Sequence, residues 1–334
     1  MIHIYLTLWI LALTSAQARQ AYTLQGRITV DRPATSIRVS LEDRKARNRE
    51  VANVTVDARG EYRIDGLLQR EYRLVATIEG KRQDRRDVDI VCRPGALVSK
   101  DFHYGKTPDT LVLSFPAEDP DTIDVAELVG DYPKDILKEY DKALQDHVNG
   151  NVARAVERLE AITAQAPDFY GAHARLGLIF QQEGCFSDAQ TEYTRASELS
   201  VRSVQPLLNL ASVQIRAASI PGQRDTMIER ALETLKKATA IRPDSALSYS
   251  LAGAARVQIL AFEEAERNFL QALDLNPTFG PARLLLADLY LKQRDWEAGI
   301  ESLETYLEDF PFATDRGVVK QMIEDAERRA DPDE

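Results

Sequence analysis

Residues 270–277 read LQALDLNP, and 34 residues further along, residues 304–311 read ETYLEDFP. Each stretch has a helical apolar pattern that stops at a proline, which lacks the backbone N–H needed to continue a helix. Prolines also stand at positions 167 and 243, a gap of 76 residues, or two 34-residue units plus eight. The spacing predicts one short helical unit copied several times, not a single globular domain.

A 34-residue frame with proline at its thirty-second position accounts for this region. Its five units begin at Ile136, Tyr170, Val204, Ala246 and Gly280. The eighth position is always small, with Ala143, Gly177, Ala211, Gly253 and Ala287, and so is the twentieth, with Ala155, Ala189, Ala231, Ala265 and Gly299. The twenty-fourth is large and apolar, with Leu159, Tyr193, Leu235, Phe269 and Leu303. Because small residues let two helices approach closely beside a bulky one, the frame predicts five stacked helical hairpins.

These units resemble the tetratricopeptide repeat (TPR) over about residues 136–311, most clearly around residues 174–196 and 265–277. The third unit carries an eight-residue insertion around residues 220–226, and a further amphipathic helix is expected at 314–329. There Val318, Val319, Met322 and Ile323 would cover the last apolar face. The resemblance implies an all-α superhelical solenoid whose first helices line a concave, protein-binding side.

Frame positions two, five, nine, twelve and thirteen would face that concave side. The residues expected to contact a partner are Tyr140, Leu144, Leu178, Gln181, Leu208, Ser212, Ile215, Arg216, Ser250, Val257, Gln258, Leu284, Asp288, Leu291 and Lys292. This lining is chiefly apolar and neutral, so the expected partner is an apolar or amphipathic segment of a protein or peptide. Periodic apolar residues also complete packing between units, and the sequence leaves both readings open.

Residues 22–104 instead alternate apolar and polar residues with a period of two. Strands are expected at 22–30, 36–41, 51–56, 61–64, 71–78, 88–91 and 96–102, with turns at 57–60, 65–66 and 79–80. Strands with one apolar face need a covering sheet, which predicts an all-β sandwich. The charged run KRQDRRD at 81–87 is expected to be a solvated hairpin or edge.

The segments TVDARGEYRI at 55–64 and EYRL at 71–74 resemble the transthyretin-like, carboxypeptidase regulatory-like family. This resemblance covers about residues 20–105. It implies a rigid spacer or attachment domain on an exported protein, and it implies no enzyme.

The first 18 residues, MIHIYLTLWILALTSAQA, form an apolar run that ends in Ala16-Gln17-Ala18, the layout of a secretory signal cleaved before Arg19. No Lys or Arg precedes the run, so an uncleaved membrane anchor stays an alternative. We expect an exported protein, periplasmic or extracellular, with no integral membrane span after cleavage. The predicted organisation is a signal at 1–18, a β-sandwich at 19–105, a linker at 106–133, five repeats at 134–311, and a capping helix with a polar tail at 312–334.

Charge and motifs exclude several classes of function. The net charge of −11 divides into +5 over residues 19–105 and −16 over 106–334, and an acidic surface repels nucleic acid. The four histidines fit no zinc-hydrolase motif, and no G-x-S-x-G or P-loop occurs, so no catalytic residue, cofactor or metal is predicted. Cys92 and Cys185 fall in different predicted domains. A disulfide between them is possible in an exported protein but would require the two domains to touch, so two free thiols are expected.

The sequence therefore favours a non-enzymatic, exported adaptor that binds a partner segment along the repeats. Two alternatives stay open: a cell-envelope or carbohydrate-binding protein that uses the β-sandwich with the repeats as a spacer, and an accessory subunit of an exported hydrolase.

Overall fold

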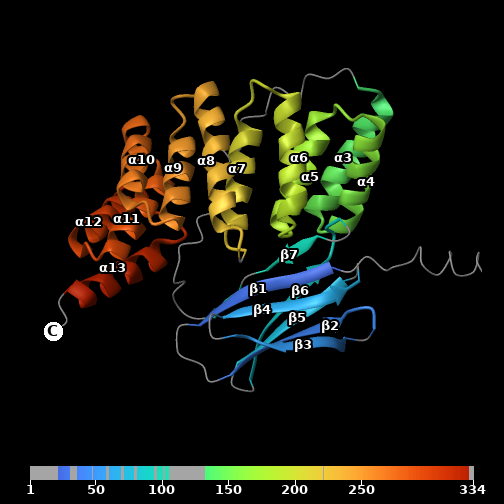
Figure 1. Cartoon of the computed structure of the whole chain (residues 1–334), viewed down its shortest axis with the longest axis horizontal. Helices are drawn as coiled ribbons and strands as arrows, with labels where there is room; N and C mark the ends of the chain where they lie inside the picture. The colour runs from blue at the N-terminus through green and yellow to red at the C-terminus, as the bar shows by residue number, and fades with distance from the viewer. Residues whose placement is uncertain are drawn as a thin grey trace, which may run out of the picture.

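The computed structural model describes residues 22–30, 36–46, 48–57, 60–68, 71–78, 81–93, 96–100, 102–104, 132–220 and 222–330 (Figure 1). Its strands are β1 (Tyr22–Val30), β2 (Ile37–Asp43), β3 (Arg49–Thr55), β4 (Glu61–Leu67), β5 (Glu71–Ile78), β6 (Lys81–Asp89), β7 (Leu97–Ser99) and β8 (Phe102–Tyr104). Its helices are α3 (Lys134–Val148), α4 (Val152–Gln165), α5 (Tyr170–Gln182), α6 (Phe186–Leu199), α7 (Gln205–Ala217), α8 (Arg224–Ile241), α9 (Ala246–Gln258), α10 (Phe262–Leu275), α11 (Gly280–Gln293), α12 (Trp296–Asp309) and α13 (Arg316–Ala330). The predicted signal at 1–18 and most of the predicted linker lie outside the described residues.

The strands form two small sheets, which together we call the β-domain. One sheet is antiparallel with the order β3-β2-β5-β6, and in the other β1 pairs antiparallel with β4 and parallel with β7 and β8. Apolar side chains from both sheets, including Leu24, Leu41 and Val98, are completely buried in one cluster. The more specific resemblance to the transthyretin-like family stays a prediction.

Two local predictions in the β-domain were wrong. Asp65-Gly66, expected to form a turn, lies inside β4, where Gly66 adopts φ +78° and the pairing with β1 shifts register between Tyr22 and Leu24. The glycine thus accommodates an irregularity in the ladder instead of ending the strand. The expected strand at 88–91 begins earlier, at Lys81, because residues 81–89 pair with β5 along its whole length and form the edge of the sheet.

The helices pack as five consecutive antiparallel pairs, from α3 with α4 to α11 with α12, and α13 covers the last pair (Figure 1). The first helices α5, α9 and α11 begin at the predicted unit starts Tyr170, Ala246 and Gly280. The helical part is therefore a TPR-like solenoid, as predicted. Val319 of α13 is fully buried in a cluster with Leu284 and Leu303, so α13 covers the apolar face of the last helix pair.

The predicted small and bulky positions meet in the helix pairs. A Cβ atom added to Gly177 would lie 2.7 Å from two ring atoms of Tyr193, and one added to Gly253 would lie 2.3 Å from the Phe269 ring. The other three units place Ala143, Ala211 and Ala287 at the same position, and their bulky residue is a leucine. Glycine thus occurs where the facing residue is aromatic, because only glycine leaves enough room for the ring.

The insertion in the third unit lengthens one helix and one loop. Helix α8 has 18 residues, whereas α4, α6, α10 and α12 have 14 each, and the chain between α7 and α8 runs from 218 to 223. The stacking of α8 on α9 continues regardless. The repeat is therefore preserved across the insertion.

Successive first helices lie closer together than successive second helices. Helix α7 contacts α5 and α9, and α9 contacts α11, while no two second helices in the described part of the chain pack as closely. The first helices therefore occupy the inner side of the curved stack. None of the described helices is long and apolar enough to cross a membrane.

Candidate protein-binding face and domain junction

The inner side is formed by α3, α5, α7, α9 and α11, which we call the first-helix face. Four of the predicted partner-binding residues are buried on it: Leu208, Ile215, Ser250 and Leu284 are at most 7% exposed. Ser250 also donates its hydroxyl to the carbonyl oxygen of Ala246, at 2.9 Å. These four side chains pack between helices, the structural reading that the sequence left open.

The other predicted residues are at least partly accessible. They are Tyr140, Leu144, Leu178, Gln181, Ser212, Arg216, Val257, Gln258, Asp288, Leu291 and Lys292. Several polar members bridge helices: Gln181 accepts a hydrogen bond from the Tyr193 hydroxyl at 3.0 Å, and Gln258 donates to the Ile215 carbonyl at 3.2 Å. Lys292 pairs with Asp288 on the same helix. The polar part of the face is thus held in place by contacts within the solenoid.

Polarity changes along the first-helix face. Frame position nine carries Leu144, Leu178, Ser212, Ala254 and Asp288 from α3 to α11. Position thirteen begins with Val148, which is 86% exposed and was not among the predicted residues, and ends with exposed Lys292. At position nine the face is therefore apolar in α3 and α5 and charged in α11, whereas position twelve runs from His147 to Leu291.

The two histidines of the helical part have structural partners. His147 Nε2 lies 2.9 Å from Gln182 Oε1. His173 is buried, with one ring nitrogen 2.6 Å from Glu192 and the other 3.1 Å from the Pro167 carbonyl oxygen. Both imidazoles link neighbouring helices.

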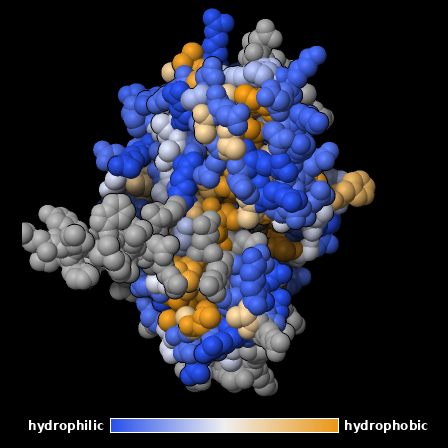
Figure 2. All heavy atoms as spheres, turned by 90° about the vertical axis from the view of Figure 1, so that its right-hand side faces the viewer, coloured by the Kyte–Doolittle hydropathy of each residue, from blue (hydrophilic) through white to orange (hydrophobic). Residues whose placement is uncertain are grey.

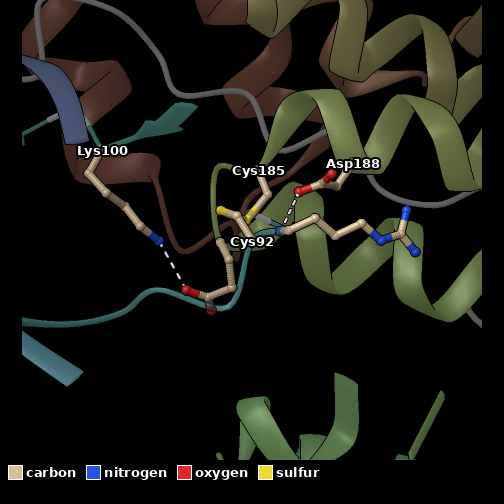
Figure 3. Close-up of a disulfide and its surroundings, with 6 residues drawn as sticks. Cys92, Lys100, Cys185 and Asp188 are labelled. Atoms are coloured by element: carbon tan, nitrogen blue, oxygen red, sulfur yellow. Dashed lines mark hydrogen bonds and ion pairs between the residues drawn. A yellow bond between two sulfur atoms is a disulfide. The ribbon is translucent and has the colours of Figure 1, made fainter. Parts of the chain in front are cut away.

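The β-domain and the solenoid meet at the turn between α5 and α6, and the prediction of free cysteines was wrong. Cys92, which follows β6, forms a disulfide with Cys185, which precedes α6, and both cysteines are at most 1% exposed (Figure 3). The Ser99 N–H donates to the Gly184 carbonyl at 3.1 Å. A Cβ atom at Gly184 would lie 2.1 Å from the Ser99 oxygen, so the close approach requires glycine.

Arg93 provides most of the polar contacts at this junction. Its backbone N–H donates to Asp188 at 2.9 Å, and its guanidinium donates to Glu160 of α4 at 3.2 Å and to Glu192 of α6. The same guanidinium lies 5.3 Å from the centre of the Phe180 ring. Lys100 adds an ion pair with Glu183 at 3.1 Å, on the other side of the disulfide (Figure 3). The β-domain is thus attached to the first two helix pairs by one disulfide bond and by the hydrogen bonds and ion pairs of Arg93 and Lys100.

Residues 261–316 match the family model of the tetratricopeptide repeat. No curated protein sequence matches the chain. Among solved structures, a thermophilic TPR protein from Thermus thermophilus is 21% identical with a TM-score of 0.47, covering 57% of this chain and 98% of its own. MamA from Desulfovibrio magneticus RS-1 is 15% identical, with a TM-score of 0.47 and coverages of 55% and 98%. PilW, a type IV pilus biogenesis factor, is 15% identical, with a TM-score of 0.47 and coverages of 60% and 94%.

Burial and pairing shift the acidity of the junction carboxylates in opposite directions. Burial raises the pKa of Asp188 above its usual value. Burial also acts to raise the pKa of Glu192, but hydrogen bonds from His173 and Arg93 outweigh it and hold that pKa below its usual value. Glu192 is therefore the carboxylate whose charge is stabilised by the junction.

Asp188 also lies beside the disulfide, and its carboxylate and the two sulfurs are all within 4.8 Å of one another. Two thiolates and a carboxylate are a ligand set that soft divalent metals accept. In the oxidised state the two sulfurs are bonded to each other and supply no thiolate.

A hollow of about 440 Å³ opens between α3 and α4, at the free end of the stack. It is lined by Ile136 and Ile162 and by the charged residues Arg154 and Arg158, among others. Arg158 is held by ion pairs with Glu139 and Asp146. Figure 2 shows this end of the molecule, where apolar surface runs between two hydrophilic sides. The hollow lies at the uncovered end of the repeat stack.

Proposed function

We propose that the chain is a non-enzymatic adaptor that holds an amphipathic segment of another protein along the first-helix face. The observation that supports this proposal is the continuous inner row of accessible side chains on five successive first helices. Solenoids of this kind generally use their concave side to bind extended or helical segments of other proteins.

The change of polarity along the face defines the partner segment. Leu144, Leu178 and the exposed Val148 offer apolar contacts at one end, whereas Asp288 and Lys292 offer a charged pair at the other. A segment with an apolar half and a polar half would satisfy both ends, because apolar surface gains from burial and the charged pair must keep polar neighbours. We therefore assign the apolar half of the partner to α3 and α5.

Site-specific photo-cross-linking tests this assignment in the full-length protein. A photoreactive amino acid at position 178 should cross-link a partner, and the variant Leu144→Asp/Leu178→Asp should reduce capture of the same partner at least tenfold. Leu270→Asp is the matched control, because Leu270 is 43% exposed on the second helix α10. Equal capture by the two variants, or cross-links only from position 270, would contradict the proposal.

We also propose that the protein is exported. The buried Cys92–Cys185 disulfide supports this, since disulfides persist in oxidising compartments and are rare in the cytosol. Cell fractionation with sequencing of the mature amino terminus tests it. A mature chain that begins at Arg19 in an exported fraction is expected, and a chain recovered in the cytosol with both cysteines reduced would contradict export.

A further inference from the structure

The disulfide joins two parts of the chain that are otherwise separate units of secondary structure. Cys92 and Cys185 are 93 residues apart, and 27 residues of sequence separate Tyr104, the end of β8, from Tyr132, which precedes α3. The described non-covalent contacts at the junction centre on a single β-domain segment, residues 90–100, against the first two helix pairs. Buried apolar side chains of the β-domain and of the helices form one continuous cluster, so in the described part of the chain the β-domain is held by the disulfide, by these polar contacts and by apolar packing around them.

We propose that the Cys92–Cys185 bond is a redox-sensitive strap that fixes the β-domain to the solenoid, and that its reduction releases the β-domain from the α5–α6 turn. The reduction is a two-electron exchange with a dithiol. One thiolate of the dithiol attacks one strap sulfur, and the other cysteine leaves as a thiolate. The second thiolate of the dithiol then attacks the mixed disulfide, which releases the first cysteine as a thiolate and forms a cyclic disulfide. Cys92 and Cys185 each keep one sulfur and take up one proton.

Burial adds a kinetic condition to this step. Cys92 is 1% exposed and Cys185 is fully buried, so a dithiol cannot reach either sulfur in the closed junction. The junction must first open while the bond is intact, and Arg93 opposes that opening through Asp188, Glu160 and Glu192. Arg93 thus acts as a positioning residue for the strap, because it controls how often the sulfurs become accessible.

Hydrogen exchange followed by mass spectrometry tests the release in the full chain, with and without dithiothreitol. The amides of Arg93 and Ser99 donate across the junction, so a peptide spanning residues 90–100 should exchange at least tenfold faster after reduction. A peptide from α10, residues 262–275, is the internal control and should not change. The variant Cys92→Ala/Cys185→Ala should exchange like the reduced protein without any reductant.

Two results would overturn the proposal. Unchanged exchange of residues 90–100 would mean that the non-covalent contacts hold the β-domain by themselves. Faster exchange in α10 as well would mean that the bond maintains the whole fold and is not a local strap. Either result is independent of partner binding on the first-helix face.

The kinetic condition has its own measurement, the rate at which dithiothreitol reduces the native protein. Arg93→Ala should raise that rate at least roughly tenfold, because the loss of one hydrogen bond to a charged group corresponds to about that factor and the variant removes the bonds to both Glu160 and Glu192. Arg38→Ala is the matched control, since Arg38 is exposed on β2. Equal rates in the two variants would show that Arg93 does not control access to the bond.

Discussion

At the scale of single residues, the contact between Gly177 and Tyr193 decides how closely α5 and α6 pack. Gly177→Ala should destabilise the protein by about 1 kcal/mol, because an overpacking cost of about 1–3 kcal/mol exceeds the gain of about 1 kcal/mol from alanine in a helix. In Gly177→Ala/Tyr193→Leu the smaller side chain should accept the added methyl group. In urea unfolding, the double variant should therefore lose about 1 kcal/mol less free energy of unfolding than the two single variants lose in sum.

The same pairing in the fourth unit supplies the control. Gly253→Ala and Phe269→Leu should show coupling of the same sign, since a Cβ at Gly253 approaches Phe269 even more closely. Additive losses in both units would show that the helices adjust without a specific match of side-chain sizes.

Leu260 is one of two non-glycine residues that adopt a left-handed backbone conformation at the same repeat position. Frame position fifteen adopts a left-handed conformation at Gly150, Gly184, Leu260 and Arg294, and Leu260 is 72% exposed with φ +61°. Leu260→Gly removes a strain of about 1–2 kcal/mol and adds about 0.5–1 kcal/mol of chain entropy to the unfolded state. We therefore expect the free energy of unfolding, measured by thermal denaturation, to rise by roughly 0.5 kcal/mol. Leu260→Ala keeps the Cβ atom and should give no gain.

At the scale of elements, the attachment of α13 depends on Tyr306 of α12. Its hydroxyl donates to both carboxylate oxygens of Asp315 at 3.0 Å, and burial together with Asp315 raises the pKa of Tyr306 to about 12. The pKa of an unfolded tyrosine is about 10, so this contribution to stability is complete below about pH 10 and is lost as the pH rises toward 12.

Tyr306→Phe tests the contribution of this pair. Phenylalanine keeps the ring contact with Phe310, whose centroid lies 5.0 Å away, and removes the titrating group. The thermal midpoint, followed by circular dichroism between pH 9 and 12, should fall less steeply in the variant than in the natural protein. Identical slopes would show that Tyr306 does not couple alkaline pH to the packing of α13.

At the scale of the whole molecule, the charged junction makes the union of the two parts sensitive to acid. The pKa of Glu192 is lowered in the folded protein. Its contribution to folding stability is therefore present above the ordinary pKa of glutamate and is lost as the pH falls through the pKa of the folded state. The raised pKa of Asp188 acts in the opposite sense and delays the net loss. Glu192→Gln should therefore flatten the decline of the thermal midpoint below about pH 4.5, near the unfolded value. Glu301→Gln on the exposed surface of α12 should not, and equal curves would contradict the assignment.

The regular spacing of small and bulky residues determined the repeat and the positions of the helix pairs. This information is local, because each contact within a pair joins residues a fixed, short distance apart in the chain. The same pattern did not separate accessible Leu178 from buried Leu208, since both occupy helix positions on the inner side and their exposure depends on the neighbouring unit.

Only the tertiary structure decided the junction. The only indication of a disulfide in the sequence was the presence of two cysteines in a chain with a predicted export signal. Arg93 belongs to no motif in the sequence. Cys92 and Cys185 are 93 residues apart, and Arg93 reaches carboxylates on α4 and α6. No periodicity encodes contacts between residues so distant, because they form only after the sheets and the helix stack exist as surfaces that can pack together.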